Sequence, residues 1–66
     1  MTPLTARERQ VRGYLCKGWL NKEIAWKLGI SVRTVEDHRT NILKKHRVRN
    51  LVELMRTVYD IPEEVA

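Results

Sequence analysis

The sequence predicts an all-α fold of four helices, and three local patterns support this prediction. Residues 5–8 have the pattern of a helix N-terminus, and an apolar stripe follows them. Residues 21–44 contain two apolar stripes of helical spacing, separated by a glycine. Residues 50–53 repeat the N-terminal pattern ahead of a further stripe.

The first helix is expected to follow a capping box at Thr5 and Glu8 and to continue to about Lys17. In such a box the hydroxyl accepts from the Glu8 amide, and the carboxylate accepts from the Thr5 amide. Gly18 is expected to end the helix. Gly13 lies inside it, where glycine costs about 1 kcal/mol relative to alanine, and only close packing would explain it.

Residues 21–44 predict two helices joined by a tight turn. Asn21 is expected to cap the first helix, and Gly29 supplies the left-handed residue that ends it. Ser31 is expected to cap the second, and small Ala25 lies where the two helices would cross. A short helix, a glycine turn and a longer helix are typical of a helix-turn-helix, here over about residues 21–40.

The fourth helix is expected over about residues 51–60, stopped by Ile61-Pro62 and followed by an acidic tail over 61–66. The side of this helix that carries Leu51, Leu54 and Val58 should face the core. A small apolar shoulder would be left over for self-association, formed by Val52, Met55 and Tyr59. Trp26 lies off the Ile24–Leu28 face of the second helix and is expected to be partly exposed. It could contact a partner there, but we favour a ring that lies flat along its own helix.

Length and composition favour a binding module. The 66 residues allow one domain, residues 1–66, whose small core leaves little room for a substrate pocket. All 13 Lys and Arg residues precede Asp60, and the same part of the chain has only five acidic residues. Its positive net charge is suited to binding a polyanion. Cys16 is the only cysteine, which is consistent with a reducing compartment. No apolar run is long enough to span a membrane, and we expect a cytoplasmic protein.

The third helix, about Val32 to Lys45, is the candidate for reading base edges, since an α-helix fits the major groove of DNA. With Val35 and Ile42 facing inward, the outward and shoulder positions carry the candidate base-contacting side chains Arg33, Glu36, Asp37, Thr40 and Lys44. For Asp37 we favour pairing with Arg33 at i+4. For Glu36, contact with a base and tethering of Arg33 both stay open.

Phosphate contacts are expected from side chains around this helix and at the start of the second: Lys22, Thr34, Arg39, Asn41 and Lys45. An enzyme is not indicated. Cys16, His38 and His46 do not have metal-site spacing, and there is no glycine-rich phosphate loop. We expect no catalytic residue, no metal and no cofactor.

The chain resembles the LuxR/FixJ-type DNA-binding domain of bacterial transcription regulators over nearly its whole length. The matching residues are Leu4-Thr5-x-Arg7-Glu8, Gly18, Asn21-Lys22-Glu23-Ile24-Ala25, Leu28, Ile30-Ser31, Arg33-Thr34-Val35-Glu36, His38-Arg39, Asn41-Ile42, Lys45, Val48, Asn50 and Glu53-Leu54. The resemblance implies four helices, with helices two and three as the helix-turn-helix and helix four as a dimer surface. It also implies double-stranded DNA as partner, binding as a homodimer and, in most members, an upstream receiver or ligand-binding domain, although stand-alone versions occur. RNA polymerase is a further candidate partner.

The chain departs from the family pattern at four places. His46 stands where a large apolar residue is usual, which suggests a looser end of helix three. Arg12 replaces a common leucine, Trp19-Leu20 replace a smaller pair, and Asp37 occupies a groove position that is often apolar or basic. Two other interpretations stay open: a promoter-binding module like sigma-factor region four, and a helical protein-interaction module that does not bind DNA.

Overall fold

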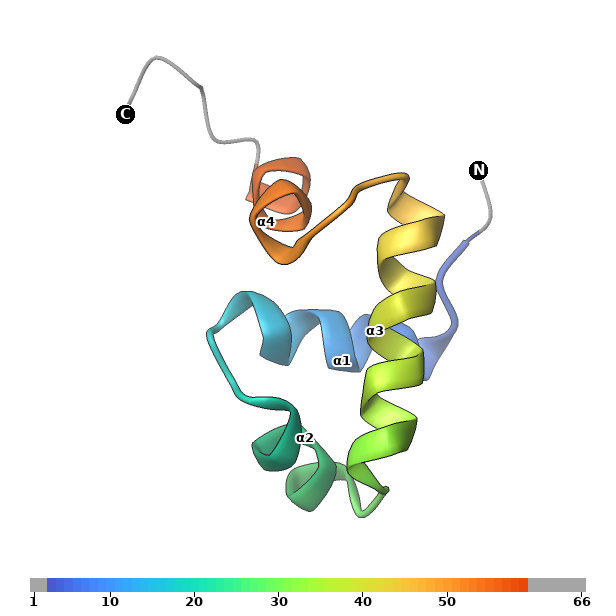
Figure 1. The fold of residues 1–66 in the computed structure, drawn as a ribbon, viewed down its shortest axis with the longest axis vertical. Helices are drawn as coiled ribbons and strands as arrows, with labels where there is room; N and C mark the ends of the chain where they lie inside the picture. Colours follow the sequence, from blue (N-terminus) through green and yellow to red (C-terminus); the bar gives the residue numbers. More distant parts are fainter. Residues whose placement is uncertain (1–2, 60–66) are drawn as a thin grey trace.

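The computed structural model describes residues 3–59, apart from the side chain of Tyr59, and contains four helices joined by short turns (Figure 1). They are α1 (Ala6–Cys16), α2 (Asn21–Leu28), α3 (Val32–His46) and α4 (Leu51–Tyr59). The predicted all-α, four-helix fold is confirmed. The expected stop at Ile61-Pro62 and the tail over 61–66 lie outside the described residues.

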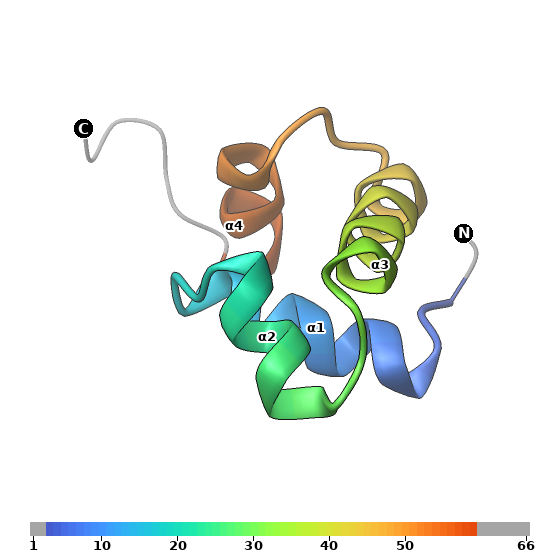
Figure 2. The same ribbon diagram turned by 60° about the horizontal axis from the view of Figure 1, so that its bottom comes forward.

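The longest helix, α3, forms the frame on which the others are arranged. Figure 1 shows α1 crossing α3, with α2 and α4 on the same side of α3. The rotated view in Figure 2 keeps α2 and α4 on that side. The side chains that meet inside are aliphatic, apart from one cysteine: Val11, Leu15, Cys16, Ile24, Ala25, Val35, Ile42 and Leu54.

Two helix starts agree with the expected caps. The Thr5 hydroxyl accepts from the Glu8 N–H at 3.1 Å, and the Glu8 carboxylate accepts from the Thr5 N–H at 2.9 Å. The Ser31 hydroxyl accepts from the Thr34 N–H at 3.0 Å. These bonds satisfy amide donors that have no partner within the helix.

The expected cap at Asn21 is wrong. Leu20 holds the extended cap position, and Asn21 is already the first residue of α2. The Glu23 carboxylate accepts from the Leu20 N–H at 2.7 Å. Because leucine has no side-chain acceptor, only this half of a capping box is formed, and the carboxylate at the third helical position is sufficient to fix the start.

The start of α4 differs in one detail from the expected capping box. The Asn50 side-chain oxygen accepts from the Glu53 N–H at 2.9 Å, as predicted. The Glu53 carboxylate accepts instead from the Arg49 N–H at 2.8 Å, and it also pairs with the Arg49 guanidinium at 3.0 Å. The guanidinium adds charge to that contact, which favours Arg49 over the Asn50 amide as the partner.

Three helices end in left-handed turns. Gly18 has φ 90° and Gly29 has φ 68°, and the following amides donate back to carbonyls five residues earlier. This geometry is the Schellman motif, in which glycine avoids the clash of a Cβ. At the end of α3 the same position is held by Arg47, with φ 57°. Within residues 3–59, it is the one non-glycine residue with positive φ.

Two residues of α4, Met55 and Val58, are not oriented as expected. Met55 packs against the core, whereas Val58 is exposed, because the described core contacts of α4 come from Leu51, Leu54 and Met55 near its N-terminus. Trp26 lies off the Ile24–Leu28 face, as expected, and is 85% exposed. It lies opposite the buried face of α2, where no neighbouring element covers it.

Candidate nucleic-acid interface

The outer face of α3 is polar and exposed. The inner face is fixed by Val35 and Ile42, both fully buried. At 100° per residue the opposite positions must then point outward. All five predicted base-contacting residues are exposed there: Arg33, Glu36, Asp37, Thr40 and Lys44. The structure therefore brings these side chains together on one continuous helix surface.

Arg33 and Asp37 form an ion pair on this surface, as predicted. The Arg33 Nε lies 3.2 Å from an Asp37 carboxylate oxygen, one helical turn away. Both side chains remain largely exposed, so the pair contributes little to stability. It restricts where the guanidinium can point, which matters for a side chain able to bind guanine with two hydrogen bonds.

The turn between α2 and α3 sets the angle at which this surface is presented. The Ile30 N–H donates to the Ala25 carbonyl at 3.0 Å, which closes the end of α2. Ala25 is buried beside α3, where a larger side chain would push the two helices apart. The Ser31 cap then starts α3 at once, so the outer face of α3 stands clear of α2.

The predicted phosphate-contacting residues divide into different environments. Lys22 is exposed at the second position of α2, and Asn41 is exposed on the shoulder of α3. Arg39 is half-buried on the inner side of that helix. The Thr34 hydroxyl lies 2.9 Å from the Ser31 hydroxyl, so part of its hydrogen-bonding capacity is used within the cap.

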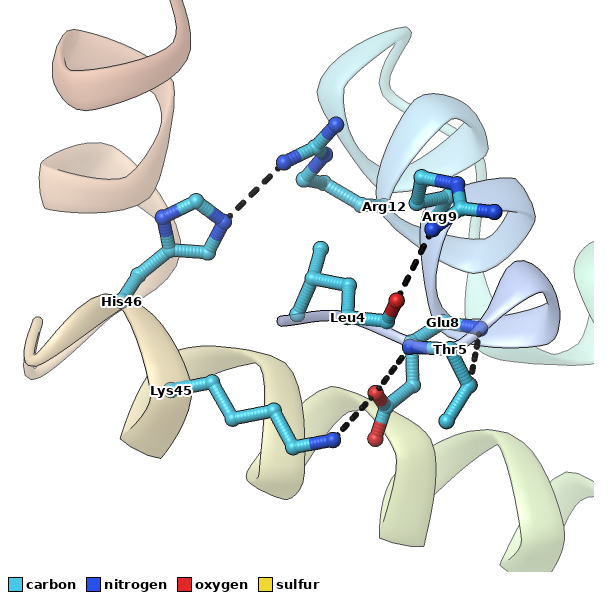
Figure 3. Close-up of polar contacts among 7 residues, drawn as sticks. All are labelled: Leu4, Thr5, Glu8, Arg9, Arg12, Lys45 and His46. Atoms are coloured by element: carbon cyan, nitrogen blue, oxygen red, sulfur yellow. Dashed lines mark hydrogen bonds and ion pairs between the residues drawn. The ribbon is translucent and has the colours of Figure 1, made fainter. Parts of the chain in front are cut away.

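Lys45, also predicted to contact phosphate, forms an ion pair within the domain. Its ammonium lies 2.7 Å from the Glu8 carboxylate, which joins α3 to α1 (Figure 3). Glu8 is only 4% exposed, and the hydrogen bond from Lys45, with that from Thr5, holds the pKa of its carboxyl below the ordinary value. Releasing Lys45 would leave a buried carboxylate without its cation.

A second polar contact beside it was missed by sequence reasoning. The Arg12 Nη1 lies 3.1 Å from the His46 Nε2 (Figure 3). A guanidinium can only donate, so His46 accepts here through an unprotonated nitrogen. Burial, followed by the nearby Arg12 charge, lowers the pKa of His46. The signal was present in the sequence, because both residues depart from the family pattern. His46, at the end of α3, is thus joined to α1 by a hydrogen bond.

The side chains that could bind a metal or act as a nucleophile are dispersed or buried in the described part of the chain. Residues 3–59 contain no cluster of three His, Cys, Asp or Glu side chains that could hold a metal ion. Cys16 is buried, and burial raises the pKa of its thiol, which disfavours the reactive thiolate. Among these residues, no helix has the length and apolar character needed to cross a bilayer.

Comparison with known proteins identifies the family. The family model described as "Bacterial regulatory proteins, luxR family" matches residues 2–58. The chain belongs to this LuxR family. It is therefore a domain of the DNA-binding type found in transcription regulators and not an enzyme. The match selects this family over a sigma-factor module and over a helical module without DNA binding.

Individual relatives of this LuxR-family domain are response regulators and transcriptional regulators. The transcriptional regulatory protein UhpA of Escherichia coli (strain K12) is 52% identical over 58 residues, which are 88% of this chain and 30% of UhpA. FixJ of Azorhizobium caulinodans is 51% identical over 53 residues, 80% of this chain and 25% of FixJ.

The solved structure of the response regulator StyR has a TM-score of 0.84 and 45% identity to this chain. The match covers 88% of this chain and 29% of StyR. The LuxR-family domain described here thus spans less than a third of each of these three relatives.

Proposed function

We propose that this domain binds duplex DNA sequence-specifically by placing the outer face of α3 in the major groove. The observation that carries the proposal is the row of exposed polar side chains on α3, at positions that packing leaves free. Each of these side chains can donate or accept at base edges, which show a distinct pattern in the major groove. The family and the names of the relatives support the same function.

Electrostatic attraction supplies the sequence-independent part of this binding. The residues before Asp60 carry all 13 basic side chains against five acidic ones. Lys22 lies at the start of α2, and the first helix of such a motif crosses the DNA backbone. We assign Lys22 to a phosphate, with Thr34, Arg39 and Asn41 as further candidates around α3.

Salt dependence tests this assignment. Log affinity for duplex DNA should fall with log salt by about 0.9 for each phosphate neutralised. Lys22→Ala should weaken binding to all sequences alike and reduce that slope by about one unit. Lys17→Ala, at the far end of α1 from the α3 surface, removes the same charge and should have a smaller effect. An affinity that does not change with salt would contradict the proposal.

We also propose that the domain binds as a homodimer through α4. Val52 supports this because it is 62% exposed on the side of α4 that faces away from the core. Met55 contributes less than we predicted, since it packs inward, and the side chain of Tyr59 lies outside the described part. Val52→Glu should leave the fold intact and reduce cooperative binding to two adjacent half-sites. Titrations on duplexes with one and with two half-sites measure this cooperativity, and unchanged cooperativity in Val52→Glu would remove α4 from the interface.

The regulatory context is proposed from the relatives. UhpA and FixJ are named as regulatory proteins and StyR as a response regulator, and all are longer than this chain. We infer that the domain serves as the output domain of a response regulator under an upstream receiver domain. Contact with RNA polymerase and a cytoplasmic location stay predictions.

A further inference from the structure

The surface of α2 opposite the core carries an apolar hollow. It has a volume of about 380 Å³ and is lined by Trp19, Lys22, Glu23 and Trp26. We call it the Trp19–Trp26 hollow. Trp26 forms one wall and is 85% exposed, so a large apolar ring stands in water. Burying such a ring gains about 25 cal/mol per Å² of apolar surface, which favours an occupant.

The second indole that lines the Trp19–Trp26 hollow is held in place. The Trp19 ring packs against the Tyr14 ring in a tilted arrangement, with a centroid distance of 4.4 Å and an interplanar angle of 41°. The Trp19 N–H donates to the Tyr14 carbonyl at 3.1 Å, as part of the turn that ends α1. A fixed indole and an exposed indole that line the same hollow offer an apolar side chain a surface on which little order has to be gained on binding.

The charges around the hollow select the chemistry of the occupant. Lys22 lines it, and Lys27 is exposed on the residue after Trp26. The Glu23 carboxylate also lines it but accepts the Leu20 N–H at 2.7 Å, at the positive end of α2, which offsets its charge. The hollow therefore suits a segment that combines carboxylates with branched apolar side chains.

The chain itself contains such a segment, at residues 60–66. Its sequence, Asp-Ile-Pro-Glu-Glu-Val-Ala, has three carboxylates, no basic residue and the branched side chains of Ile61 and Val65. These residues lie outside the described part, and only their sequence enters here. We propose that residues 60–66 dock intramolecularly in the Trp19–Trp26 hollow, with an apolar side chain between the indoles and carboxylates beside Lys22 and Lys27.

The lengths involved allow this docking. Leu51, the first residue of α4, lines a neighbouring hollow together with Trp19. α4 has nine residues, so its length of about 13 Å keeps Tyr59 within that distance of Leu51. A segment of seven residues spans up to about 24 Å. α2 and α4 also lie on the same side of α3 in both views (Figures 1 and 2).

Nuclear magnetic resonance of the whole chain tests the docking directly. Methyl groups of Ile61 or Val65 placed against an indole should be shifted upfield by its ring current. The shifts should disappear in Trp26→Ala and in the combined variant Asp60→Asn, Glu63→Gln, Glu64→Gln. Val52→Ala, which changes an exposed apolar residue on α4, should leave them unchanged.

Three results would overturn the proposal. Random-coil methyl shifts in the unchanged chain would mean that the segment does not dock. Upfield shifts that persist in Trp26→Ala would place it elsewhere. Shifts that fade on dilution would assign the segment to the hollow of a second copy, which contradicts intramolecular docking. None of these readouts needs DNA, so they are independent of the proposed function.

Docking at Lys22 has a consequence that rests on the proposed DNA binding. A segment beside Lys22 competes with phosphate for that ammonium. Trp26→Ala, which changes no charge, should then raise DNA affinity at least twofold in the unchanged chain. It should have no effect once Asp60, Glu63 and Glu64 are neutralised. Equal effects of Trp26→Ala in both backgrounds would contradict this consequence. Absence of DNA binding by the unchanged chain would instead count against the proposed function.

Discussion

Arg12 in α1 donates a hydrogen bond to His46 at the end of α3, with Nη1 and Nε2 3.1 Å apart. By resemblance, the family usually has leucine and a large apolar residue at these two positions. The pair thus replaces an apolar contact between two helices by a polar one. If only one of the two positions were polar, its polar group would lack this hydrogen-bond partner and lie next to an apolar side chain. The two departures from the family pattern therefore depend on each other.

His46→Gln should remove one part of the acid sensitivity of this domain. Burial and Arg12 lower the pKa of His46 below 6.5 in the folded state, so the unfolded chain binds more protons at mildly acidic pH. Stability should therefore fall as pH drops below about 6.5. Glutamine offers Arg12 an acceptor and does not titrate, so His46→Gln should keep its stability in that window. Urea unfolding followed by circular dichroism from about pH 3 to pH 8 measures the difference.

A second loss should begin at lower pH in both proteins. The Glu8 pKa is held below 4.5 by Lys45 and Thr5, so its contribution is present above 4.5 and is lost as pH falls through the lower, folded value. This step is an internal control, because His46→Gln does not change it. Identical pH profiles above 4.5 for both proteins would show that His46 does not govern this range.

Lys45→Ala should destabilise the fold far more than the same change at its neighbour. Lys45 neutralises Glu8, which is 4% exposed, at 2.7 Å. Leaving a buried charged group without its partner costs about 1–3 kcal/mol or more. Lys44 is exposed, and Lys44→Ala should stay within about 0.5 kcal/mol. Chemical denaturation compares the two, and equal losses would mean that the ion pair contributes nothing.

The sequence predicted the features of this fold that depend on near neighbours. The Thr5–Glu8 box, the Ser31 cap and the Arg33–Asp37 pair all join residues three or four positions apart, where helical spacing decides contact. The helix-turn-helix follows from such local patterns, which is why the candidate surface on α3 was predictable.

Contacts between distant parts of the chain were not predicted. The Glu8–Lys45 and Arg12–His46 contacts join residues 37 and 34 positions apart, and no periodicity specifies them. Met55 and Val58 were assigned to the wrong environments because periodicity gives the direction of a helix face and not the extent of the neighbouring core. The extent of Trp26 exposure was not predictable for the same reason, since it depends on which element covers α2.

Gly13→Ala should stabilise the domain by about 0.5–1 kcal/mol, because alanine reduces the freedom of the unfolded chain and favours a helix. The close packing that would have explained this glycine is absent: an added Cβ meets nothing within 4 Å. Thermal unfolding should therefore show a higher midpoint for the variant. A lower midpoint would show that the glycine has a role that the packing does not reveal.

Arg47→Gly should also stabilise the domain, although this change introduces a glycine whereas Gly13→Ala removes one. Arg47 ends α3 with φ 57°, a conformation that costs a residue with a Cβ about 1–2 kcal/mol. Arg47→Ala is the matched control, since it removes the same side chain and charge but keeps the Cβ. The glycine variant should be more stable than the alanine variant by about 1 kcal/mol in urea unfolding. Equal stability of the two would contradict strain at this position.

The last prediction concerns how α3 reads DNA, and it rests on the exposed positions of Thr40 and Asp37. Thr40 can donate, accept or place its methyl group against thymine. Thr40→Ala should change the preferred base at one position per half-site, at a cost of about 1–3 kcal/mol on the favoured sequence. Selection from random duplexes, compared with the unchanged chain, measures this preference.

Asp37→Ala should act differently, because Asp37 holds Arg33 at 3.2 Å. Its loss removes an acid near phosphate and frees the guanidinium, so general affinity should rise while discrimination between sequences falls. If Asp37 instead accepted from cytosine, its loss would relax one position and lower affinity for the best site. The same selection separates these outcomes. Identical selected sequences from the unchanged chain, Thr40→Ala and Asp37→Ala would mean that this face of α3 does not read bases.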